Sequence, residues 1–176
     1  MDDDHFWGIT EALAKGAREG RLSAPARSIL GAMSVSELLA LYEFIEEKRK
    51  KLYVKEVLEV GAILNGMELS DDGVSDFTCW LVFEGKETFE LVLSDPDRLA
   101  EIEIRPEIIE EHDFDGFGYD VLEVLLAKAE GDSSIDAAID DIQRPEIEEW
   151  YEISSASLAR RYPRLWEKYG ARFIAF

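Results

Sequence analysis

A helix-start signal followed by a long helical pattern is the feature that most constrains the fold of this chain. Ser34 precedes Glu37 by three residues, which is the spacing of a capping box. Apolar residues then recur at helical spacing, at Val35, Leu38, Tyr42, Ile45 and Leu52. Arg49 falls on the same face, where its aliphatic stem can lie along the edge of a core. The sequence therefore predicts one long amphipathic helix over 34–53.

Helix signals recur through the rest of the chain. Apolar stripes at helical spacing indicate further helices over residues 6–17, 54–64, 74–84, 89–93, 121–126, 135–142 and 158–169. Pro163 interrupts the last of these, and Ser133 or Ser134 can cap the helix over 135–142. Residues 17–25 are typical of a loop, and no alternating strand series is present. With 176 residues, we expect an all-α or mostly α fold, as a single compact multi-helix domain over 1–176.

The charge of the chain is strongly negative and unevenly distributed. There are 39 acidic and 19 basic residues, which gives a formal net charge of −20. Residues 53–153 carry a net charge of −23, whereas the basic C-terminal segment, 154–176, carries +4. Such a charge repels nucleic acid and anionic membranes and attracts a basic protein partner. We expect five cations to fold back across the acidic body, with a separate partner-binding tail as the alternative: Arg160, Arg161, Arg164, Lys168 and Arg172.

The cysteine content and the N-terminal residues limit the class of protein further. The only cysteine, Cys79, excludes an internal disulfide and a multi-cysteine zinc site, and its apolar surroundings predict a buried thiol. The first residues, MDDDHFWG, lack the basic start and apolar core of a signal peptide. No apolar run approaches the length of a membrane span. We therefore expect a cytoplasmic protein without a membrane segment and without a cofactor.

The acidic stretch over 70–97 has two interpretations, a metal loop or a set of helix starts. In a calcium loop with Gly73 in sixth position, the twelfth position should be glutamate but is Cys79. As helix starts, Ser70 or Asp71 caps one helix, and Asp95 caps another with Pro96 in its first position. Because the calcium pattern fails at its bidentate ligand, the capping interpretation is favoured.

Catalytic chemistry has little support elsewhere in the sequence. His112 is one of two histidines and lies among acids that together form a weak metal or acid–base pattern: Glu110, Glu111, Asp113 and Asp115. In a chain this acidic, chance proximity is the favoured interpretation. Neither a glycine-rich phosphate loop nor a nucleophile elbow is present. No catalytic residue and no metal ligand is predicted.

Three segments of the chain resemble a known bacterial family, domain of unknown function 4240. They are His5–Trp7, the central series from Ser70 through Trp80 and Gly85 to Asp95–Leu99, and the closing Tyr162–Trp166. Where family members often carry a glycine–cysteine pair before the Ser-Asp-Asp, this chain has Met67–Leu69, and the segment 105–150 matches none of the family pattern. The resemblance implies a mostly helical bacterial protein and implies no activity.

The sequence therefore favours a non-enzymatic acidic protein that binds a basic protein partner, for example as an inhibitor or immunity-type protein. The candidate binding residues are seven carboxylates: Asp71, Asp72, Asp76, Asp140, Asp141, Glu148 and Glu149. One alternative is a divalent-metal-dependent enzyme that uses Asp71, Asp72 and Asp76 or the His112 cluster. A third hypothesis is an oligomeric subunit in which residues 173–176 dock in a neighbouring chain, although closure of the chain's own core is favoured for them.

Overall fold

The computed structural model describes residues 3–15, 17–18, 21–22, 24–104, 118–142 and 154–174. The first half contains α1 (Asp3–Lys15), β1 (Ala17–Arg18), β2 (Arg21–Leu22), α2 (Ala24–Ala32), α3 (Val35–Leu52), α4 (Lys55–Asn65), α5 (Asp71–Phe83), α6 (Lys86–Ser94) and the 3₁₀ helix η1 (Pro96–Glu101). The second half contains α8 (Gly118–Ala129), α9 (Ser133–Asp140), α10 (Ser155–Arg161), α11 (Pro163–Tyr169) and the 3₁₀ helix η2 (Gly170–Arg172). The predicted mostly α fold class is confirmed. In the segment expected to be a loop, β1 and β2 form a two-residue antiparallel pair.

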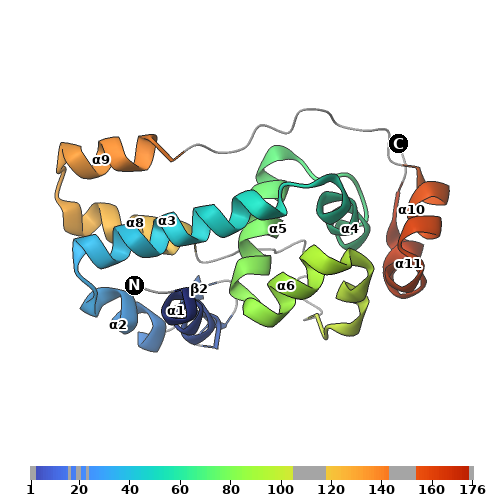
Figure 1. Ribbon diagram of the computed structural model, residues 1–176, viewed down its shortest axis with the longest axis horizontal. Coiled ribbons are helices and arrows are strands. Elements are labelled where there is room, and N and C mark those ends of the chain that lie inside the picture. The colour runs from blue at the N-terminus through green and yellow to red at the C-terminus, as the bar shows by residue number, and fades with distance from the viewer. Residues whose placement is uncertain are drawn as a thin grey trace.

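Helix α3 begins where its capping box predicts. The Ser34 N–H donates to the Glu37 carboxylate at 2.8 Å, and the Glu37 N–H donates to Ser34 Oγ at 3.3 Å. Leu38, Leu41 and Ile45 are completely buried along its inner face. Figure 1 shows α3 running along the long axis of the molecule, and both α5 and α8 pack against it. The helix is therefore the central support of the fold.

Helices α4 and α5 follow their sequence signals closely. Gly66, with φ of 75°, ends α4 in the left-handed conformation that favours glycine. Ser70 caps α5, because its Oγ accepts the Gly73 N–H at 3.1 Å. Phe77 is completely buried, and a Cβ added at Gly61 of α4 would lie 2.7 Å from its ring. The absence of a side chain at Gly61 therefore lets α4 and α5 approach closely.

The C-terminal helices form a pair that packs on α4 and η1. Pro163 separates α10 from α11 as predicted, and Leu158, Tyr162 and Leu165 are buried beneath them. Phe173 packs against Trp166, with 5.7 Å between ring centroids, whereas Ala175 and Phe176 lie outside the described residues. Figure 1 shows α10 and α11 at one end of the long axis and α9 at the opposite end.

One predicted cap is wrong, and another has the predicted position but lacks its side-chain hydrogen bond. Asp132, and not Ser133 or Ser134, caps α9, since its carboxylate accepts the Ser134 N–H at 2.9 Å. The Asp132 side chain reaches the N–H of Ser134, the second residue of the helix. Ser133 and Ser134 therefore lie inside the first turn and not at the cap position. Asp95 precedes η1 but makes no side-chain cap, because its carboxylate accepts a hydrogen bond from Arg164 at 2.7 Å.

Candidate functional site

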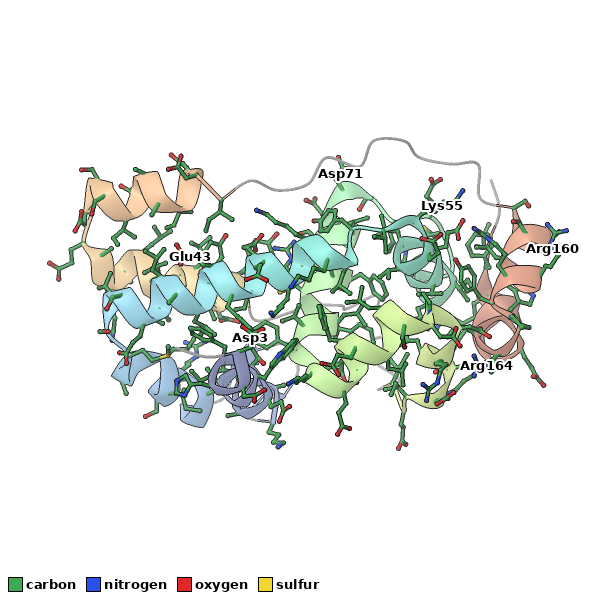
Figure 2. All side chains as sticks on the ribbon, in the orientation of Figure 1. Asp3, Glu43, Lys55, Asp71, Arg160 and Arg164 are labelled. Carbon is green, nitrogen blue, oxygen red and sulfur yellow. The ribbon has the colours of Figure 1, made fainter. Side chains whose placement is uncertain are left out.

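The predicted binding residues lie on separate elements. Asp71 and Asp72 are exposed in the first turn of α5, and Asp76 is half-buried one turn later. Asp140 and Asp141 are exposed at the end of α9. Figure 2 labels Asp71 near the middle of the molecule, whereas Figure 1 shows α9 at one end. The predicted Glu148 and Glu149 lie outside the described residues.

The acids at and just before η1 form ion pairs with the basic C-terminal segment. Arg164 pairs with three carboxylates, through Nη2 to Asp95 at 2.7 Å, Nε to Asp97 at 3.0 Å and Nη1 to Glu101 at 2.9 Å. Lys168 Nζ also donates to the carbonyl oxygen of Ala100 at 2.9 Å. Figure 2 shows Arg160 and Arg164 at this end of the molecule. The expected folding back of the tail across acidic residues is confirmed for Arg164.

A second cation of the tail reaches a buried carboxylate. Glu59 of α4 is 4% exposed and pairs with Arg161 of α10. The same carboxylate accepts a hydrogen bond from the Tyr162 hydroxyl at 2.6 Å. A buried carboxylate needs both charge and hydrogen-bond partners to remain ionised, and the tail supplies both. The tail is therefore part of the folded body at this end.

Among the described residues, the opposite end of the molecule shows no such pairing. Helices α8 and α9 and their connecting turn expose six carboxylates, which we name the α8–α9 acidic surface: Glu123, Glu130, Asp132, Asp136, Asp140 and Asp141. Among the residues that the structure describes, no cation lies within ion-pair distance of these six. The one basic residue of α8, Lys128, donates instead to the carbonyl oxygens of Gly31 and Met33, at 2.6 and 2.5 Å. The surface therefore keeps its negative charge.

Hydrogen bonding favours the ionised state of one acid on this surface, Asp132. The Ser134 hydroxyl and N–H both donate to Asp132 Oδ1, at 2.7 and 2.9 Å. These bonds, the hydroxyl bond first, lower the pKa of Asp132 below its ordinary value. The carboxylate at the start of α9 is therefore charged at neutral pH. It also interacts favourably with the positive end of the helix dipole.

A buried arginine on α3 forms a polar cluster that sequence reasoning missed. Arg49 is 5% exposed and pairs with Glu46, one turn earlier on the same helix. Its guanidinium also donates to Thr78 Oγ1 at 3.3 Å and to Ser75 Oγ at 2.6 Å, both on α5. The position of Arg49 on the apolar stripe of α3 was the available signal. The Arg49 side chain joins α3 to α5 in the interior and does not lie along the edge of the core.

A small pocket adjoins this cluster between α3, α5 and α8. It is lined by Tyr42, Glu46, Arg49, Ser75, Cys79, Gly118, Tyr119 and Leu122, and its volume is about 10 Å³. That is room for roughly one water molecule, which excludes an organic substrate. Burial raises the pKa of the Cys79 thiol to about 11, so the thiol is neutral at physiological pH and a poor nucleophile. The predicted burial of Cys79 is confirmed.

The metal-dependent alternative gains no support from the described residues. Within the ranges that the structure covers, no three His, Cys, Asp or Glu side chains converge in a way that would hold a metal ion. Asp71, Asp72 and Asp76 lie within the described ranges and do not form such a group. His112 and its acidic neighbours lie outside those ranges. None of the described helices has the length and apolar content needed to cross a bilayer.

Comparison with known proteins identifies the family. A family model described as "Protein of unknown function (DUF4240)" matches residues 1–129, which is well over half of the chain. The match includes the central motif of α5, α6 and η1, whereas the Tyr162–Trp166 segment lies beyond it. No curated protein and no solved structure matches the chain. On the strength of the match over 1–129, the chain belongs to the DUF4240 family.

Proposed function

We propose that this protein is a non-enzymatic binding protein whose α8–α9 acidic surface engages a basic protein partner in the bacterial cytoplasm. An inhibitor or immunity-type protein would act in this way. One observation carries the proposal: the basic tail pairs with acids at one end of the molecule, whereas the six carboxylates at the other end have no described cation within ion-pair distance.

The electrostatic consequence of this asymmetry supports association with a cation. Six carboxylates within one pair of helices repel one another, and the Debye length of about 8 Å at physiological salt does not fully screen neighbours one helical turn apart. A basic partner relieves that repulsion and is drawn toward this end by the local field. The same field disfavours nucleic acid, whose phosphates are also negative.

Association kinetics with three forms of the full-length protein test the proposal. The partner is first isolated from host lysate with the wild-type protein at low and moderate salt. The test variant is Asp136→Asn/Asp140→Asn/Asp141→Asn, and the control, Glu68→Gln/Glu87→Gln/Glu90→Gln, removes the same charge from exposed sites elsewhere. We expect the association rate of the test variant to fall by about tenfold at low salt, while the control stays close to wild type. Equal rates for both variants would contradict the proposal.

A further inference from the structure

Helix α9 leaves a row of isoleucines only partly covered. Ile135 and Ile139 lie one turn apart on α9, and Ile142 follows at the same helical spacing. They pack against the core, yet no residue of α9 is buried. Leu126 of α8 is 42% exposed and lies about one turn before the Glu130–Gly131 turn that joins the two helices. Apolar area is therefore available to a partner at this end of the molecule.

The apolar row is bordered by acids. Asp132, Asp136 and Asp140 recur at intervals of four, so they line one face of α9. Each of Asp136 and Asp140 directly follows an isoleucine, which places the acidic row about 100° around the helix from the apolar row. Because the isoleucines also pack against the core, an occupant of this surface meets their partly exposed edges, with carboxylates along one side.

Charge decides between the available occupants. A second copy of the chain has a net charge of −20 and would be repelled. The chain's own basic segment is bound at the other end, where Arg161 pairs with Glu59 and Arg164 with Asp97. Residues 143–153 contain four acids and one base, so they are not a cationic occupant either. The complementary occupant is a basic segment of a different protein that also has apolar anchors.

We infer that the α9 docking face, defined as Leu126, Ile135, Ile139 and Ile142 with Asp136 and Asp140, receives a basic amphipathic helix of the partner. The inference rests on the proposed function and adds the mode of contact. Apolar anchors at i, i+3 or i+4 and i+7 of the partner helix cover the isoleucine row, and its lysines or arginines reach the aspartates. Apolar contact slows dissociation, whereas the acids accelerate association.

Two synthetic peptides of identical composition test the mode of contact against the full-length protein. One places leucines at helical spacing and lysines elsewhere over about five turns, and the other scrambles the same residues. We expect the patterned peptide to bind about tenfold more tightly. Leu126→Ser should weaken the patterned peptide about fivefold, whereas the matched control Leu93→Ser, on an α6 side chain that is 38% exposed, should leave binding unchanged.

Three results separate failure of the inference from failure of the proposed function. In the first result, both peptides bind equally, and Asp136→Asn/Asp140→Asn weakens both to the same extent. This result contradicts the apolar contact but agrees with the acidic interaction. Binding that ignores the aspartate variant overturns both, as does no binding of either peptide. Should Leu126→Ser fail to fold, NMR shift changes on the wild-type protein replace it: changes in α8 and α9 support the inference, and changes confined to α5 or α6 overturn it.

Discussion

The carboxylate of Asp97 accepts two hydrogen bonds from Arg164, from its backbone N–H at 3.2 Å and from Nε at 3.0 Å. It also accepts the Leu165 N–H at 2.9 Å, so it caps the first turn of α11 from 67 residues away. The two segments that meet here, Asp95–Leu99 and Tyr162–Trp166, both carry the sequence resemblance to the family. The acidic turn at η1 is therefore the docking point for the C-terminal helices.

Removing this cap should destabilise the protein. Asp97→Ala leaves the buried Leu165 N–H without its acceptor and Arg164 without its most buried partner. We expect the free energy of unfolding to fall by about 2–4 kcal/mol, measured by urea denaturation. Glu101→Gln is the matched control, because Glu101 pairs with the same arginine but is 44% exposed, and it should cost under about 1 kcal/mol. Equal losses for the two variants would rule out the capping role.

The limits of sequence reasoning follow from the distance between partners. Ser34 and Ser70 were predictable as caps because each bonds to an N–H three residues later. The stretch at Asp95–Asp97 has the same local pattern, but its partner Arg164 lies nearly 70 residues away, and charge pairing with it replaces the local cap. A local pattern cannot distinguish these two outcomes.

The buried pair of Arg49 and Glu46 gives a second test. Arg49→Met leaves the Glu46 carboxylate buried without its cation, which should lower the free energy of unfolding by about 3 kcal/mol or more. The double variant Glu46→Gln/Arg49→Met removes the uncompensated charge and should be more stable than Arg49→Met alone. Thermal unfolding of wild type, the single variants Glu46→Gln and Arg49→Met, and the double variant measures the coupling. Additive losses would show that the two side chains are energetically independent.

Only two of the six carboxylates of the α8–α9 acidic surface were predicted from the sequence. Asp140 and Asp141 were predicted, yet the other four were missed, because each is an ordinary exposed acid when considered alone: Glu123, Glu130, Asp132 and Asp136. What distinguishes them is the position of the cations, and that depends on the docking of the C-terminal helices at the opposite end. Such a relationship belongs to the tertiary structure.

The contact between α8 and α5 should tolerate no added methyl group. A Cβ at Gly118 would lie 2.8 Å from the sulfur of Cys79, which is buried. We expect Gly118→Ala to cost about 1–3 kcal/mol in urea denaturation. Adding Cys79→Ala removes the sulfur and should recover part of that loss, so the double variant is more stable than the sum of the single effects. A simple sum would contradict the close contact.

Alkaline pH should destabilise the docking of the C-terminal helices through Tyr162. Burial raises the pKa of its hydroxyl from the ordinary value of 10.0 to about 12, and the folded protein holds this proton more tightly than the unfolded chain. The stabilisation is therefore complete below pH 10 and is lost as the pH rises toward 12, by up to about 3 kcal/mol.

The measurement compares urea denaturation of wild type and Tyr162→Phe from pH 9 to 12. The variant loses its hydrogen bond to Glu59 at every pH, which lowers its stability by a constant amount of about 1 kcal/mol. Because other groups, including Cys79, titrate in both proteins, only the difference between the two curves reports Tyr162. We expect wild type to lose its advantage above pH 10. A difference that stays constant to pH 12 would show that the Tyr162 proton is not held by the fold.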